Sequence, residues 1–371
     1  MDRIPTTDPI GELFEDYSMS LRGRASDKRA RRPLARRPRS RLDRLAVVVE
    51  EVNNFSERDV IGGRSTHIAL KNPKSYLIGT EERGLKVIER DAQVFSGKLH
   101  ENDRFLCDVV YCPAMNCYFL ASLKMLYRKD INDRTPYRWM KIDFRGRIGA
   151  YLRYSSLNQR LMVVKGGTRI AVINPKTKKI EIVLEKSVGG IIKDFRVFGE
   201  QENRVVAVTV QGSLIAYSLD FKNQRGEVAF NEALKKMWEH GLSIAVCSRN
   251  EYVCVEIESK WDSCKMSVFR LEEESLVQVA CLDLHKKKIH AKYALEFLGY
   301  ADRHLLWVGL SWENNGVAEV YNYDLESKKL KELEKKREQH QENRPLKLHR
   351  LGDKLYYVGK KGKLMCLSVI E

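Results

Sequence analysis

The chain has 371 residues, with 66 lysines and arginines against 50 aspartates and glutamates and a formal net charge of +16. Its hydrophobic share of 43% is enough for a packed core, and no stretch approaches the ~18 consecutive apolar residues of a transmembrane helix. The first residues contain several acids and no apolar secretory core, which argues against a signal peptide and a mitochondrial presequence. We therefore expect an intracellular protein, either cytoplasmic or nuclear.

Residues 1–44 are predicted to be a disordered, arginine-rich tail. Residues 22–44 carry eleven basic residues against two acids, with prolines at 33 and 38. So few apolar side chains cannot offset the entropy of ordering the segment. A nuclear import signal, an arm on nucleic-acid phosphates, an anchor for acidic proteins and a solvated linker all stay open. The tail residues predicted to bind anions are Arg29, Arg31, Arg32, Arg36, Arg37 and Arg39.

A short amphipathic pattern covers residues 8–21 of this tail. Asp8 and Pro9 suit the start of a helix, and five large apolar side chains follow near helical spacing. A helix of this length is marginal by itself. Docking on a partner, folding onto the rest of the chain and disorder are three open readings of the segment.

From residue 45 onward, one pattern of strands recurs seven times. Each unit begins with an apolar innermost strand, which is followed by a central hairpin of two strands. A polar break and a charged outer strand complete the unit. The density of apolar residues predicts that the innermost strands are buried on both faces. A repeat of 42 to 52 residues with four strands in each unit is the signature of propeller blades. The most apolar strands begin at Tyr76, Tyr118, Arg160, Arg204, Tyr252, His304 and Lys354.

The seventh unit, residues 346–370, supplies only three strands. The fourth is available at the other end of the repeat region, in LAVVVEEV over residues 45–52. An N-terminal strand that completes the last blade closes the ring and removes its free edges. The sequence thus predicts an all-β, seven-bladed β-propeller over residues 45–371, closed by an N-terminal strand and preceded by the basic tail.

In strand order and period, residues 45–371 resemble the WD40-like propellers. The Gly-His and Trp-Asp signatures of that family are missing, and Trp261-Asp262 falls in a loop. The chain is therefore similar to a divergent member. Two packed β-domains are the main rival architecture.

No catalytic motif appears in the sequence. It has no Walker motif, GxSxG elbow, HExxH or paired-carboxylate pattern, and we expect no cofactor and no metal. Cys107, Cys112 and Cys117 form no CxxC and have no nearby histidine, so they are predicted to be buried, reduced thiols. His67 and His349 lie in predicted strands and are interpreted as structural. An enzyme site assembled from several blades at the axis would leave little trace in one sequence, so a propeller enzyme is kept as an alternative.

The resemblance implies that the loops joining strands two and three, and those joining strand four to the next blade, share one face. We call it the basic face, because in this sequence these loops are rich in lysine and arginine. Such a surface favours anionic partners, and tryptophans beside cations suit peptide anchoring or base stacking. The residues predicted to bind a partner there are Lys286, Lys287, Lys288, Lys360, Lys361, Lys363, Arg145, Arg147, Trp261 and Trp312.

The leading interpretation is a non-enzymatic scaffold whose basic face binds an acidic protein segment or a protein complex. We expect it to be monomeric outside that complex. The first alternative is a nucleic-acid-associated propeller that places its tail and basic face on phosphates. The second is an enzyme with an axial site.

Overall fold

The computed structural model describes residues 46–52, 65–80, 84–99, 106–122, 124–133, 135–142, 152–184, 190–233, 239–247, 252–259, 263–272, 275–284, 292–301, 303–311, 318–333, 347–358 and 364–370. All of the described strands belong to one compact unit, Arg44–Glu371. The predicted tail, with its segment 8–21 and its six arginines, lies outside the described residues.

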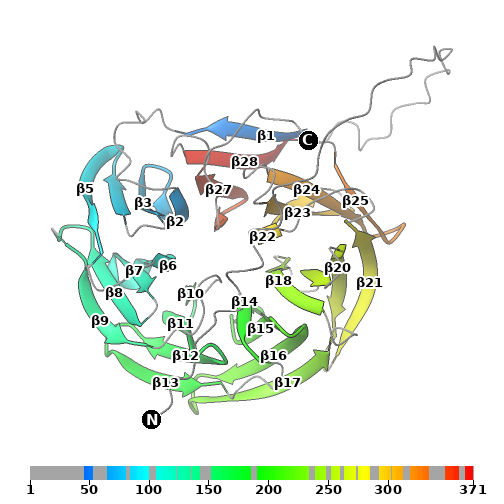
Figure 1. The fold of residues 1–371 in the computed structure, drawn as a ribbon, viewed down its shortest axis with the longest axis horizontal. Coiled ribbons are helices and arrows are strands. Elements are labelled where there is room, and N and C mark those ends of the chain that lie inside the picture. Colours follow the sequence, from blue (N-terminus) through cyan, green and yellow to red (C-terminus); the bar gives the residue numbers. More distant parts are fainter. Residues whose placement is uncertain are drawn as a thin grey trace, which may run out of the picture. The chain divides into compact units, whose positions relative to one another are not determined.

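Seven antiparallel sheets of four strands are arranged radially around an axis, as Figure 1 shows. This confirms the predicted seven-bladed propeller. In six of the sheets the strands follow chain order from the axis outward. Blade 1 consists of β2 (Ser65–Asn72), β3 (Ser75–Thr80), β4 (Gly84–Glu89) and β5 (Ala92–Lys98). Blade 2 consists of β6 (Leu106–Cys112), β7 (Cys117–Ser122), β8 (Met125–Asp130) and β9 (Tyr137–Lys141).

The next four blades repeat this order. Blade 3 consists of β10 (Leu152–Ser155), β11 (Arg160–Lys165), β12 (Arg169–Asn174) and β13 (Lys179–Val183). Blade 4 consists of β14 (Ile192–Phe198), β15 (Arg204–Thr209), β16 (Ser213–Asp220) and β17 (Arg225–Ala233). Blade 5 consists of β18 (Glu239–Val246), β19 (Tyr252–Ser259), β20 (Ser263–Leu271) and β21 (Leu276–Asp283). Blade 6 consists of β22 (Lys292–Ala301), β23 (His304–Ser311), β24 (Ala318–Asp324) and β25 (Lys329–Glu332).

Blade 7 draws its strands from both ends of the repeat region. Its order is β26 (His349–Leu351), β27 (Lys354–Val358), β28 (Leu364–Ile370) and then β1 (Ala46–Glu51) at the outer edge. β1 runs antiparallel to β28, with Ala46 opposite Ile370. Blade 7 also packs against blade 1 through a buried cluster that includes Ile68, Tyr76 and Tyr356. The ring therefore closes through side-chain packing as well as through the β1 pairing.

The hydrophobic core lies between neighbouring blades. One buried cluster joins blades 2, 3 and 4, and others join blades 1 and 2, 4 and 5, 5 and 6, and 6 and 7. The most apolar strands predicted from the sequence supply much of this core, and their observed starts lie within one residue of the predicted ones. Each blade is consequently held by apolar burial against its neighbours, at ~25 cal/mol for each Å² removed from water. None of the described residues forms a helix long and apolar enough to cross a membrane.

Candidate functional site

An irregularity in the innermost strand of blade 2 directs an aspartate toward the next blade. The β6–β7 register shifts between Leu106 and Asp108, and a bulge of this kind re-aims the side chain beside it. Asp108 Oδ1 accepts a hydrogen bond from the amide of Val109 at 2.8 Å. Its Oδ2 accepts one at 2.8 Å from the amide of Leu152, the first residue of β10 in blade 3. Asp108 therefore joins blades 2 and 3 through the backbone.

Blade 4 contains the same arrangement of a register shift beside a buried aspartate. The β14–β15 register shifts between Ile192 and Asp194. Asp194 Oδ1 accepts the amide of Phe195 at 2.8 Å, and its Oδ2 accepts the amide of Ile244 on β18 at 3.2 Å. Asp194 thus joins blade 4 to blade 5 in the way that Asp108 joins blade 2 to blade 3.

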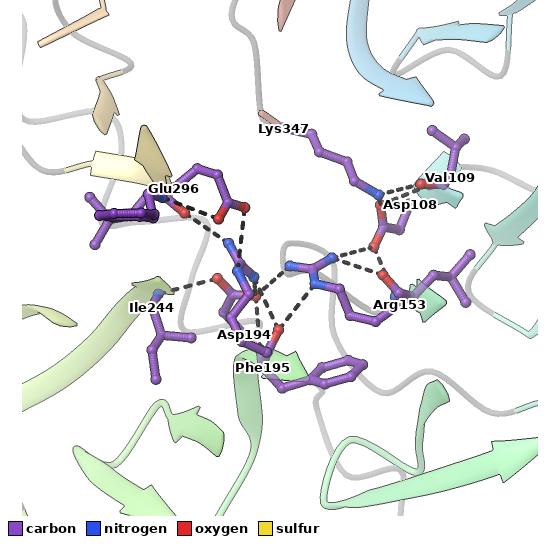
Figure 2. Close-up of polar contacts among 12 residues, drawn as sticks. Asp108, Val109, Arg153, Asp194, Phe195, Ile244, Glu296 and Lys347 are labelled. Carbon is purple, nitrogen blue, oxygen red and sulfur yellow. Dashed lines mark hydrogen bonds and ion pairs between the residues drawn. The ribbon is translucent and has the colours of Figure 1, made fainter. Parts of the chain in front are cut away.

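These two aspartates belong to a group of charged side chains that meet at the axis, shown in Figure 2. We call this group the axial cluster. It contains three carboxylates and three cations, so its formal charges cancel. The six side chains are only 1% to 17% exposed. Its members are Asp108, Arg153, Asp194, Arg196, Glu296 and Lys347.

Two arginines connect the carboxylates of the axial cluster. Arg153 on β10 donates to Asp194 at 2.8 Å and lies 3.7 Å from Asp108. Arg196 donates to Asp194 at 2.6 Å, and its Nε lies 3.5 Å from Glu296 on β22. Arg196 also donates to the carbonyl of Leu295 at 2.8 Å. Because β14 belongs to blade 4 and β22 to blade 6, Arg196 links two blades that are not neighbours in the ring.

Lys347 makes a second link between blades that are not neighbours. It lies two residues before β26 of blade 7, and its Nζ donates to Asp108 Oδ1 at 2.5 Å and to the carbonyl of Val109. Both acceptors are in blade 2, so the link passes over blade 1. Together the six side chains and the backbone groups that they bind join blades 2, 3, 4, 5, 6 and 7.

Charge pairing decides the protonation of the aspartate at this link. Burial raises the pKa of Asp108, but the nearby charges of Lys347 and Arg153 outweigh burial and hold that pKa below its usual value. Burial lowers the pKa of Lys347, and the Asp108 carboxylate opposes this effect. Asp108 and Lys347 therefore stabilise each other's charged form. Removal of either one would leave the other charge buried without a partner.

Two histidines lie beside the axial cluster. Burial lowers the pKa of His67 to about 4, with Asp108 opposing the shift and Lys347 adding to it. Burial, with the charges of Lys347 and Arg153, lowers the pKa of His349 to about 3. Both imidazoles are therefore neutral at physiological pH, as expected of structural histidines. Among the residues that the structure describes, no group of three or more His, Cys, Asp or Glu side chains is placed to hold a metal ion.

We expect stability to fall as the pH decreases from 6.5 to 4, partly because of His67. In that window an unfolded chain, with a pKa of 6.5, binds a proton that the folded chain, with a pKa of about 4, does not bind. The loss should reach roughly 3 kcal/mol at pH 4, at about 1.36 kcal/mol for each pKa unit. Urea unfolding at pH 7, 5.5 and 4 measures this slope. His67→Gln should make the slope shallower, and an unchanged slope would contradict the assignment.

The axial carboxylates are committed to structural contacts. Both oxygens of Asp108 and both oxygens of Asp194 accept hydrogen bonds, and Glu296 faces Arg196. The convergence of carboxylates, which would otherwise favour an axial enzyme site, therefore supports a role in holding the blades together.

The axial cluster was not predicted from the sequence. The innermost strands are largely buried, as expected, but they are not purely apolar, since charged side chains of β6, β10, β14 and β22 face the axis. The available signal was a charge inside an otherwise apolar strand, as in LCDVVYC, IKDFRVF and ALEFLGY. Only tertiary placement shows that these charges neutralise one another.

The ten residues predicted to bind a partner on the basic face lie outside the described residues. Described residues in loops of the same two types show how these loop types are arranged. The amide of Ile142 donates to the carbonyl of Lys124, and that of Ile192 donates to Gly167. In both cases a loop that enters the next blade contacts a loop between strands two and three, so the two loop types share a face. The exposed, described cations on that face are Lys98, Lys124, Lys141, Lys165 and Arg169.

The exposed cations of the basic face lack described counter-charges. None of the five has an ion-pair partner among the described residues. The opposite face has ion pairs within single blades, such as Lys71 with Glu89 at 3.2 Å, Arg160 with Glu181 at 2.5 Å and Arg270 with Glu272 at 2.7 Å. It also has exposed cations without a described ion-pair partner, among them Lys176 and Lys179. On the basic face, Lys165 and Arg169 even lie directly opposite each other in the β11–β12 hairpin, where like charges repel.

Comparison with known proteins supports the propeller fold. No protein-family model and no curated protein matches the sequence. Among solved structures, the chain is similar to the β-propeller domain of Cps50 (Swd1) from Myceliophteria thermophila, with a TM-score of 0.52 and 12% sequence identity. The match covers 67% of this chain and 80% of that chain. The chain is therefore a seven-bladed β-propeller, similar in fold to that domain.

Proposed function

We propose that this protein is a non-enzymatic, intracellular interaction scaffold whose basic face binds an acidic segment of a partner protein. The observation that carries the proposal is the group of five exposed cations on the basic face without a described ion-pair partner, two of which, Lys165 and Arg169, lie directly opposite each other. A closed ring braced by the axial cluster offers a platform that does not need to rearrange on binding, which limits the entropic cost of association. Electrostatic complementarity then favours acidic partners and speeds encounter with them.

Reversing two charges on the basic face should weaken binding of an acidic peptide. We expect Lys165→Glu with Arg169→Glu to raise the Kd for a fluorescent poly-glutamate probe at least ~10-fold, because attraction becomes repulsion at two adjacent sites. Fluorescence anisotropy at fixed ionic strength measures the effect. Reversal of Lys286, Lys287 and Lys288 to glutamate tests the predicted loop on the same face.

A matched control lies on the opposite face of the same blade. Lys176 and Lys179 are exposed at the β12–β13 turn, and changing both to glutamate alters the net charge by the same amount. This control should leave the Kd within about twofold of the original, since most surface charges at that distance are screened at physiological salt. Equal weakening by both double variants would show a general charge effect and would contradict the basic-face proposal.

The arginine-rich tail supports nucleic acid as a second candidate ligand. Its six predicted anion-binding arginines and the cations of the basic face would then contact phosphates. Binding to RNA or duplex DNA should weaken steeply as salt rises, with a log–log slope of roughly −0.7 to −0.9 for each phosphate contacted. Removing residues 1–44 should make that slope shallower. Absence of binding to either nucleic acid at low salt would eliminate this candidate.

A further inference from the structure

Two cysteines face each other at one end of the innermost hairpin of blade 2. Cys112 is the last residue of β6, Cys117 is the first residue of β7, and the two are opposite each other in the strand register. The 3₁₀ helix η5 (Pro113–Met115) and Asn116, whose φ is +47°, connect them. Both cysteines are free and buried.

The sulfur of Cys112 is surrounded by hydrogen-bond donors. The Cys117 thiol donates to it, and the hydroxyl of Tyr154, from blade 3, donates as well. The hydrogen bond from Cys117, opposed by burial and aided by the nearby amide of Met115, lowers the pKa of Cys112 to about 7. The same contact, together with burial, raises the pKa of Cys117. Cys112 is therefore the more acidic of the two thiols, and Cys117 keeps its proton.

Their position in the register also suits a covalent bond. Directly opposed residues of antiparallel strands have Cα atoms ~4.5–5.5 Å apart, and disulfides span Cα separations of ~4.4–6.8 Å. The two side chains are also close enough for each to shift the pKa of the other. A disulfide here requires side-chain rotation and no separation of the strands.

We propose that Cys112 and Cys117 form a redox-active pair that hydrogen peroxide converts into a disulfide, with Cys112 as the attacking thiol and Cys117 as the resolving one. The Cys112 thiolate attacks one peroxide oxygen, the O–O bond breaks, and the products are Cys112 sulfenic acid and hydroxide. The Cys117 sulfur then displaces the sulfenic hydroxyl group, which takes the Cys117 proton and leaves as water, while the hydroxide from the first step takes one proton from solvent. Two thiols are oxidised by two electrons, and one peroxide is reduced to two waters.

The surroundings select a small oxidant. Both sulfur atoms are buried, whereas Pro113 and Asn116 in the connecting turn are exposed. A molecule of the size of peroxide needs only a local opening of this turn, but a protein oxidant would have to unfold the hairpin. Thiol reactivity follows the thiolate, so the oxidation rate should rise about tenfold between pH 6 and pH 8.

Peptide mapping of the full chain tests the proposal directly. The reduced protein is treated with hydrogen peroxide, its remaining thiols are alkylated, and it is cleaved with cyanogen bromide, which cuts after Met115 and Met125 and so separates Cys112 from Cys117. Mass spectrometry should find the fragment 116–125 joined to the fragment that contains Cys112. Cys107 shares the latter fragment, so the experiment is repeated in Cys107→Ser, where the linkage should persist.

Two variants assign the roles of the cysteines. In Cys117→Ser, Cys112 sulfenic acid should accumulate and be trapped by dimedone; in Cys112→Ser, neither the disulfide nor a trapped Cys117 should form. Cys366 is a matched control, because it is a buried thiol that contacts a tyrosine, Tyr356, but its pKa is raised by burial. It should remain reduced. Dimedone on Cys117 in place of Cys112, or oxidation of Cys366 at the same rate as Cys112, would overturn the proposal.

Discussion

Asp194→Ala should destabilise the propeller by ~3–5 kcal/mol, the range found when one member of a buried ion pair is removed. Asp194 is buried and accepts from Arg153 at 2.8 Å and from Arg196 at 2.6 Å. Without it, two desolvated guanidinium groups lie close together with no carboxylate between them. The amides of Phe195 and Ile244 also lose their acceptor. Chemical denaturation at pH 7, followed by tryptophan fluorescence, should show the transition at lower denaturant.

The control for this variant is Glu272→Ala. Glu272 pairs with Arg270 at 2.7 Å, a geometry as good as that at Asp194, but both side chains are exposed. We expect no measurable shift in the transition, because water replaces the partner of an exposed charge. If Asp194→Ala shifted the transition as little as Glu272→Ala, the axial cluster would not hold the blades together.

Removal of β1 should have the second large effect. A chain that begins at residue 53 loses the outer strand of blade 7 and the six residue pairs that join β1 to β28. At ~0.5–1.5 kcal/mol for each ladder hydrogen bond, the loss should be at least ~3 kcal/mol, and β28 becomes an open edge. Thermal unfolding and size-exclusion chromatography should show a lower Tm and association of the truncated chains.

A chain that begins at residue 45 is the matched control. It lacks the arginine-rich tail and keeps β1, so its Tm should equal that of the full chain. The comparison separates the contribution of the strand from that of the tail. Equal Tm values for all three chains would show that closure depends on the packing of blade 7 against blade 1, and that the N-terminal strand contributes nothing.

The fold could be predicted from the sequence because its signals are local and repeated. Each blade has a strand rich in β-branched and aromatic residues, such as RLMVV from Arg160 and RVVAV from Arg204, and turns at similar spacing. Because the pattern occurs seven times, its period can be recognised although no two units have the same sequence. The three-stranded seventh unit then predicted where the fourth strand had to come from.

The axial cluster could not be predicted in this way because its partners are far apart in the chain. Lys347 and Asp108 are separated by 239 positions, and no local pattern indicates that they meet. The choice of Asp108 and Asp194 as inter-blade acceptors depends on bulges in the inner strands, which a count of apolar residues does not reveal. The basic face lies between these cases. Its loop types followed from strand order, but the pairing of Lys165 with Arg169 across a hairpin depends on the exact register of β11 and β12.

The axial cluster has a further consequence for what the rest of the molecule is free to do. Its bonds are made by innermost strands and by Lys347, close to the centre, so these links between blades do not involve the outermost strands of blades 1 to 6 or most of the loops that connect the strands. Loops at the periphery can accordingly be exchanged, lengthened or changed in charge while the axial cluster stays intact. The same architecture would in that way support a change of partner without a change of fold.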